Sequence, residues 1–233
     1  RFVLMPGASL SGTITGQLDD ADEIVLNVTA DPGVAQVIEF LPTSIRRNGA
    51  TVASFENVQS PRNLVVHGTG GHDQIVLEAD GTPGTWRIRS LNGTFEAITF
   101  NGPLDSLRID GGEGDDVLAV LPSATLVTAL TLEGGEGADT LQGGAGNETL
   151  VGGAGYDTYV FDADSARGSD TIVELVGGGT DTLDFSGSSA GVSADLGKSA
   201  AQVAHANLTI TLRSGSVIEN VKGGSGADTL TGN

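Results

Sequence analysis

Three units of nine residues follow one another without a gap between Gly134 and Val160. Each unit begins with Gly-Gly and has Gly at its fourth position, an acid at its sixth and a large apolar residue at its eighth. A unit this short cannot bury its apolar side chain alone, so successive units must stack on one another. The period therefore predicts an elongated fold of stacked windings with very short strands.

The residue types within each unit indicate a metal site. Glycine allows the backbone to take a positive φ and bend sharply, which leaves carbonyl oxygens free to face one point. The acid at the sixth position, which is Asp139, Glu148 or Asp157, adds a charged oxygen. Carboxylate and carbonyl oxygens are the ligands that Ca²⁺ prefers. The array therefore predicts that the chain binds several calcium ions.

Further copies of the unit flank the array. GTGGHDQIV, GGEGDDVLA and GGSGADTLT place Asp73, Asp116 and Asp228 at the sixth position, and imperfect copies after Val160 contain Asp170 and Asp181. Asp73 and Asp116 are 43 residues apart, whereas Asp116 and Asp139 are 23 apart. We interpret residues 63–133 as a wider, irregular β-solenoid with sparse units, and residues 134–233 as a regular roll.

Residues 1–62 contain no such unit, and we expect a β-rich module or a cap for the solenoid. β-forming residues cluster at 11–15, 23–29, 34–41 and 51–58, with turn residues between them. The acids Asp19, Asp20, Asp22 and Glu23 are more typical of a solvated turn than of a metal site. Farther along, strands are expected at 85–91, 95–100, 208–213 and 217–221.

The charge of the chain follows the repeats. The net charge is −19, and 23 of the 30 acidic residues lie after residue 66. Such a surface makes nucleic acid an improbable partner. There is no Cys, and no apolar run reaches the roughly 18 residues of a membrane span. Because the chain opens at Arg1 and stops where another unit could begin, we expect a processed chain or a piece of a longer protein.

Residues 63–233 resemble the hemolysin-type calcium-binding (RTX) family, including the segments DTYVFDAD and IENVKGGSGADTLTGN. The resemblance implies an all-β fold, a right-handed parallel β-solenoid or β-roll with eighteen residues in each coil. Asp139 and Asp157 are eighteen residues apart and should lie on one edge, with Asp116 below them if residues 120–129 bulge outward. Glu148 should face the opposite edge, where its longer side chain departs from the pattern.

The ligands that the resemblance implies come from two successive loops. One loop supplies the carbonyls of Gly134 and Glu136 with the Asp139 carboxylate, and the other supplies the carbonyls of Gly153 and Gly155 with Asp157. The residues expected to contact calcium are Gly111, Glu113, Asp116, Gly134, Glu136, Gly137, Asp139, Gly153, Gly155, Asp157, Gly223, Ser225, Asp228, Asp73, Asp170 and Asp181.

Other motifs carry weaker signals. Gly187–Gly191 fits the G-x-S-x-G pattern of hydrolases, but no helix pattern follows it. The three histidines form no metal-binding motif, although His72 borders an acidic loop. Asp162, Asp164 and Asp170 only faintly resemble an EF-hand loop, and Trp86 with Arg87 and Arg89 is more typical of an ordinary strand face than of a sugar-binding face. We therefore expect a protein that is not an enzyme.

We expect a calcium-binding structural segment of a secreted or cell-surface RTX protein, which folds and stiffens when Ca²⁺ binds outside the cell. The resemblance implies type I secretion. The alternatives are a non-catalytic export and folding module of a secreted enzyme, or a carbohydrate-binding solenoid. Candidate partners besides calcium are neighbouring repeats, further copies of the chain and polysaccharide.

Overall fold

The computed structural model describes residues 2–4, 13–15, 23–27, 37–41, 44–47, 50–56, 63–94, 97–101, 104–121, 129–174, 178–213 and 217–232. For the strands before residue 57 it describes the course of the backbone only. All regular elements in these ranges are β-strands, which confirms the predicted all-β class.

Two large sheets contain almost all of the described strands. The first has the order β1 (Phe2–Leu4), β3 (Glu23–Asn27), β7 (Asn63–His67), β11 (Ser106–Glu113), β13 (Ala129–Glu136), β15 (Glu148–Ala154), β17 (Gly168–Val173), β21 (Leu208–Leu212) and β20 (Gln202–His205). The second has the order β2 (Thr13–Thr15), β6 (Ala50–Glu56), β5 (Ser44–Arg47), β4 (Val37–Leu41), β10 (Ala97–Asn101), β9 (Thr85–Ser90), β8 (Gln74–Ala79), β12 (Val117–Val120), β14 (Thr140–Gln142), β16 (Thr158–Val160), β18 (Thr182–Asp184) and β22 (Asn220–Lys222).

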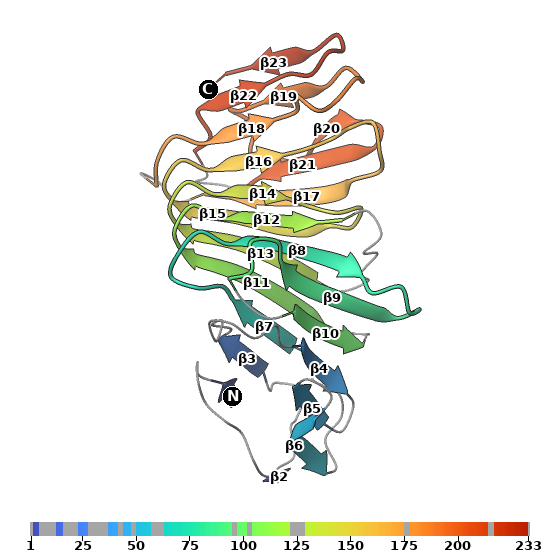
Figure 1. Ribbon diagram of the computed structural model, residues 1–233. Helices are drawn as coiled ribbons and strands as arrows, with labels where there is room; N and C mark the ends of the chain where they lie inside the picture. The colour runs from blue at the N-terminus through green and yellow to red at the C-terminus, as the bar shows by residue number, and fades with distance from the viewer. Residues whose placement is uncertain are drawn as a thin grey trace.

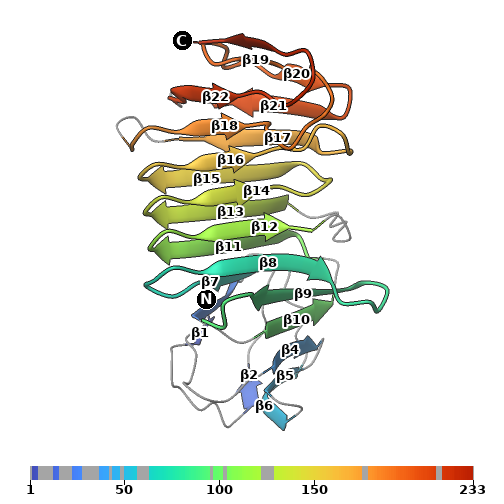
Figure 2. The same ribbon diagram turned by 45° about the horizontal axis from the view of Figure 1, so that its top comes forward.

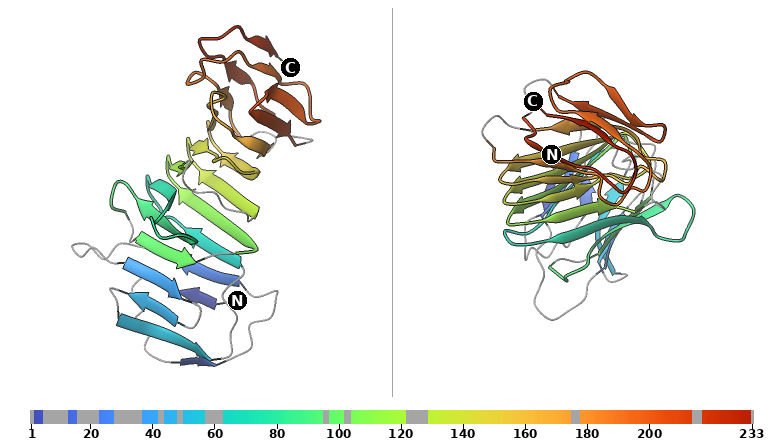
Figure 3. Two further views of the ribbon diagram at one scale, coloured as in Figure 1. Left: turned by 90° about the vertical axis from the view of Figure 1, so that its right-hand side faces the viewer. Right: turned by 90° about the horizontal axis from the view of Figure 1, so that it is seen from above.

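From β11 to β18 the chain alternates between the two sheets. Each of these strands pairs in parallel with the next strand of its own sheet, β11 with β13 and β12 with β14 for example. The strands therefore stack one above another along the molecule (Figures 1 and 2), and the successive windings superpose when viewed from above (Figure 3). This arrangement is consistent with the β-roll that the resemblance implies.

The core between the sheets is thin because most windings turn only one or two large side chains inward from each strand. Four eighth-position residues lie in register along the second sheet and are fully buried, namely Leu118, Leu141, Tyr159 and Leu183. Facing them in the first sheet is a second buried column, Ile109, Leu132, Leu150, Ile172 and Leu212.

The strands before residue 57 extend both sheets. β1 pairs in parallel with β3, and β3 pairs in parallel with β7. The structure confirms a strand at each of the four expected segments and adds β1 and β5, and β5 pairs antiparallel with both β4 and β6. Asp19, Asp20 and Asp22 lie outside the described residues, and the bounds of the three expected regions stay a prediction.

Residues 74–101 differ from the parallel solenoid expected there. β9 pairs antiparallel with both β8 and β10, and the β8–β9 turn projects beyond the stack (Figure 2). Gly81 and Gly84 take positive φ values of 88° and 80°, and these conformations allow the tight turn that joins the two antiparallel strands. Glu78 then binds Arg87 and Arg89 across the hairpin, so the arginines are paired within the protein.

The C-terminal end departs from strict alternation as well. β20 pairs antiparallel with β21, and β19 (Ser193–Asp195) pairs with β23 (Thr229–Thr231) in a separate sheet. The β20–β21 pair and the β19–β23 sheet both lie at the C-terminal end of the stack, near β22 (Figure 1). Within the described part of the chain, no helix has the length and apolar character needed to cross a membrane.

Candidate metal centre

A ladder of acids runs along the edge where the chain passes from the first sheet to the second. The backbone N–H of each acid donates to a carboxylate oxygen of the acid in the next winding. The bonds run from Asp73 to Asp116 at 2.7 Å, from Asp116 to Asp139 at 2.7 Å, from Asp139 to Asp157 at 2.8 Å and from Asp157 to Asp181 at 2.9 Å. The structure thus confirms that Asp139 and Asp157 share an edge with Asp116 below them.

The second carboxylate oxygen has a different environment. Oδ2 of Asp116, Asp139 and Asp157 is buried and has no hydrogen-bond partner, and each of these residues is 1 % exposed. A buried carboxylate oxygen without a partner costs several kcal/mol when the group is charged, so such groups bind a metal or a cation, or they take up a proton. The three unpaired oxygens recur at the same place in successive loops.

The electrostatics of the ladder agree with this. Burial raises the pKa of Asp116 to about 7 and the pKa of Asp139 and of Asp157 to about 6, against ordinary values near 4. The neighbouring carboxylates contribute to the raised pKa of Asp116 and of Asp157. Burial also raises the pKa of Asp181. The ladder therefore attracts protons and divalent cations alike.

Glycine at the first position of a unit makes room for this carboxylate. A Cβ on Gly111, Gly134 or Gly223 would overlap Oδ2 of the Asp in the same unit. In the array, Gly135 and Gly137 take positive φ values of 118° and 133°, and each packs directly against a carbonyl of the loop below. The repeated glycines are thus explained by close packing of carboxylate and backbone.

Gly134→Ala is expected to lower the free energy of unfolding of the calcium-saturated protein by about 1–3 kcal/mol, because overpacking displaces the Asp139 carboxylate. The new Cβ would also lie 2.7 Å from the Cβ of Asp139. The matched control is Gly187→Ala, because a Cβ there meets nothing within 4 Å. Thermal unfolding followed by circular dichroism checks this, and equal melting temperatures for the two variants would count against the packing argument.

The carbonyl groups that the resemblance implies as calcium ligands do not all face the gap between the Asp139 loop and the Asp157 loop. Glu136 O accepts from Gly114 N at 2.8 Å, and Gly134 O lies against Gly111, so both carbonyls face the loop of Asp116. The carbonyls of Gly135 and Gly137 face the loop of Asp157 instead, against Gly153 and Gly155. The implied ligand set therefore combines carbonyl groups that face two different gaps between successive loops, because alternate residues of a parallel strand face opposite neighbours.

The opposite edge of the stack holds Glu148 and Asp170. Glu148 N donates to Asp170 Oδ1 at 2.9 Å, and Glu148 Oε2 and Asp170 Oδ2 are buried without partners. Burial raises the pKa of both groups, whereas the charge of Arg167 lowers it. The Arg167 side chain is 7 % exposed and donates to Gly143 O at 3.1 Å. Asp170 thus lies away from the Asp139 ladder, on an edge where the protein supplies its own cation.

Asp228 also lies outside the ladder, together with Gly223 and Ser225. Its Oδ1 accepts from Val192 N at 2.9 Å, on the side of the β19–β23 sheet. The ladder ends instead at Glu219, whose Oε2 accepts from Asp181 N at 2.8 Å. The register of β18 with β22 aligns Asp181 with Glu219, which a comparison of DTLD with ENVK could have indicated.

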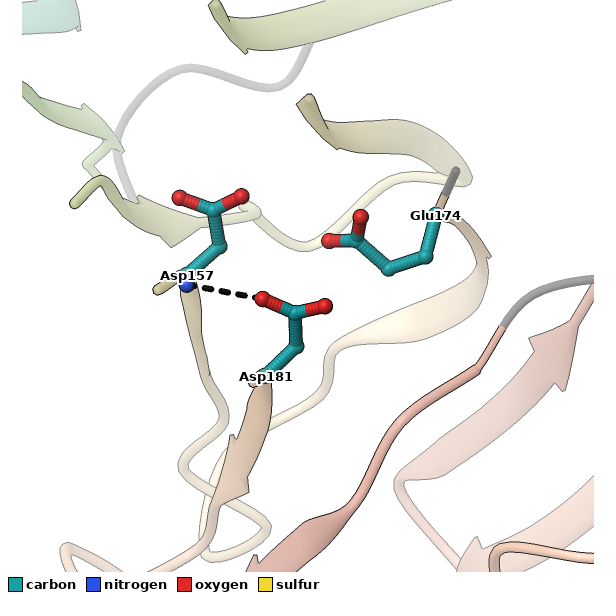
Figure 4. A group of neighbouring side chains, drawn as sticks. All are labelled: Asp157, Glu174 and Asp181. Atoms are coloured by element: carbon teal, nitrogen blue, oxygen red, sulfur yellow. Dashed lines mark hydrogen bonds between the residues drawn. The ribbon is translucent and has the colours of Figure 1, made fainter. Parts of the chain in front are cut away.

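Glu174 is a second acid that the unit pattern does not identify. Val173 pairs with Val151, so Glu174 follows in register with Gly152, the first position of its unit. Its side chain is buried, and one of its oxygens lies within 4.8 Å of oxygens of Asp157 and Asp181. Figure 4 shows the three carboxylates gathered in one gap. The aligned pairs Leu150-Val151 and Ile172-Val173 are the signal that could have found it.

The competing motifs form ordinary structure. Ser189 and Ala190 donate backbone N–H groups to Asp164 within a turn, and the strand β19 follows where a hydrolase elbow needs a helix. His72 is exposed and accepts from Asp115 N at 2.9 Å. Trp86 stacks on Phe100 with ring centroids 6.1 Å apart and is partly buried against the core.

Comparison with known proteins identifies the repeat. The sequence model of the RTX calcium-binding nonapeptide repeat matches four copies, within residues 108–119, 131–159 and 215–233. No curated protein and no solved structure matches the chain. The ladder residues Asp116, Asp139 and Asp157 all lie within the matched segments.

Proposed function

We propose that this chain, which carries RTX calcium-binding nonapeptide repeats, is a structural segment of a secreted or cell-surface protein. In this proposal the two sheets are the faces of a right-handed parallel β-roll that folds and stiffens when Ca²⁺ binds between successive windings. The segment itself is not catalytic. A non-catalytic export and folding module of a secreted enzyme would use the same ladder in the same way.

The unpaired, buried carboxylate oxygens of Asp116, Asp139 and Asp157 carry this proposal. Each of these carboxylate oxygens lies at a glycine-rich loop, and backbone carbonyl groups of the same loop pack against the next winding. Carboxylate with carbonyl oxygen is the donor set that Ca²⁺ prefers, so the residues present fit the ion. A bound ion would neutralise the repulsion between stacked acids.

Calcium would stabilise the fold because the thin core and the glycine-rich loops of this region provide little stability on their own. The core is two facing columns of mostly Leu and Ile side chains, and glycine-rich loops lose much conformational entropy when they become ordered. The free energy of ion binding therefore becomes free energy of folding. Sites with dissociation constants of roughly 10⁻⁴–10⁻³ M would fill in extracellular calcium and stay empty in the cytosol.

Calorimetric titration of the whole chain with Ca²⁺ tests the proposal. We expect several ions to bind, and we expect Asp139→Asn to remove at least one, because Asp139 contacts the loops on both sides. The charge-matched control is Asp80→Asn on the β8–β9 turn, where Asp80 lies 3.5 Å from Arg87 and outside the ladder. A chain that binds no calcium would overturn the proposal.

A further inference from the structure

We propose that Asp157, Glu174 and Asp181 form an additional divalent-cation site made of side-chain carboxylates. The inference rests on the proposed function, because this gap belongs to the same ladder, but it assigns a ligand outside the nonapeptide pattern. The cation would be one that prefers hard oxygen ligands, Ca²⁺ or a trivalent lanthanide as its probe.

The position of Glu174 sets this gap apart. In the units below, the equivalent residue is Gly111, Gly134 or Gly152, whose hydrogen leaves room for a carboxylate of the same unit. Glu174 instead directs a carboxylate inward, and the residue is only 5 % exposed. At this position the gap therefore holds a charged carboxylate, whereas the equivalent position in the other units is a glycine.

The three carboxylates converge. One oxygen from each lies within 4.8 Å of the others, and Asp157 N donates to Asp181 Oδ1 at 2.9 Å (Figure 4). A Cβ on Gly152 would overlap both Glu174 Oε1 and Asp157 Oδ2, so these two oxygens approach the same side of that glycine. Three acids this close repel one another unless a cation or a proton lies among them.

A separate observation indicates a ligand in the gap. Asp157 is 1 % exposed, and its Oδ2 has no hydrogen-bond partner although it lies on the same side of Gly152 as the Glu174 carboxylate. Oδ1 of the same carboxylate already accepts from Asp139 N at 2.8 Å, which fixes the orientation of the unpaired oxygen. The gap thus contains a buried acceptor that the described protein atoms leave unsatisfied.

Tyr159 positions Glu174. The neighbouring windings have Leu141 and Leu183 in register with it, and only the tyrosine offers a hydroxyl, which donates to Glu174 Oε1. The ring is fully buried and cannot leave this place without opening the core. Tyr159 is therefore a positioning residue, and its ring lies close enough to the gap to sensitise terbium luminescence.

Three measurements on the whole chain test the site. Calorimetry with Ca²⁺ should find one ion fewer in Glu174→Gln than in the wild type, because calcium affinity follows the number of charged ligands. The glutamine keeps an oxygen that can accept from Tyr159, so the hydrogen bond survives while the charge is removed. An unchanged number of ions would overturn this site and leave the proposed function standing, whereas a wild type that binds no calcium would overturn both.

Terbium luminescence excited through tyrosine supplies the second readout. Tyr159→Phe and Glu174→Gln should each remove most of the emission, and Tyr156→Phe, which changes an exposed ring, should retain it. Emission unchanged in both Tyr159→Phe and Glu174→Gln would overturn the site. Anomalous scattering from terbium-soaked wild-type crystals needs no variant, and peaks confined to the other gaps would overturn it as well.

Discussion

Removal of calcium with a chelator is expected to abolish most of the far-ultraviolet β-sheet signal that residues 110–233 contribute. Without metal, Asp116, Asp139 and Asp157 must either stay charged against one another or bind protons in a buried site. Uncompensated burial costs several kcal/mol for each ion, which is of the order of the whole stability of a small domain. The thin core cannot offset such a cost, so the windings should separate.

Circular dichroism of the whole chain in calcium, in chelator and after calcium is restored checks this result. The signal should return on restoration, and Mg²⁺ should restore less of it, because Mg²⁺ is smaller and gives up its water reluctantly. A control with the same ionic strength and no chelator excludes a salt effect on a chain of net charge −19. An unchanged spectrum in chelator would refute metal-dependent folding.

The sequence predicted the regular part of the fold because its physical cause is local. The resemblance implied eighteen residues in each coil, and this spacing correctly placed Asp157 above Asp139. Asp116 is 23 residues before Asp139, and it was placed below Asp139 on the expectation that residues 120–129 bulge outward; the bond between the two acids confirms the placement. One apolar residue in each unit was enough to predict that Leu141 and Leu150 are buried, and they lie in the two facing columns of the core.

Features that depend on pairing between distant segments were not predictable in this way. The antiparallel β8–β9–β10 segment was read as further parallel winding, because short apolar runs do not reveal strand direction. Asp228 matches the unit in every position, yet β23 pairs with β19 and takes it out of the ladder. Glu174 and Glu219 match no unit position, and only the register of their strands reveals them.

The metal-free chain is expected to be more stable at about pH 5 than at about pH 8. Burial raises the pKa of Asp116 to about 7 and of Asp139 to about 6, so the folded state binds protons more tightly than the unfolded state. The stability from these protons is complete below the unfolded pKa near 4 and is lost as pH rises through 6 and 7. One pKa unit corresponds to about 1.4 kcal/mol, so the acids together contribute on the order of several kcal/mol.

The far-ultraviolet β-sheet signal that remains in chelator across this pH range measures the effect, and saturating calcium should reverse its sign, because protons and Ca²⁺ compete for the same oxygens. Asp116→Asn provides the matched test, because the Asn side chain has the shape of a protonated, neutral Asp and does not titrate. This variant should retain more β-sheet signal than the wild type in chelator at about pH 8, and it should melt at a lower temperature than the wild type in calcium. Asp80→Asn, which removes the same charge from an ion pair on the β8–β9 turn, should show neither change. If the metal-free wild type were less stable at the acid end, the buried ladder would not be the element that controls folding.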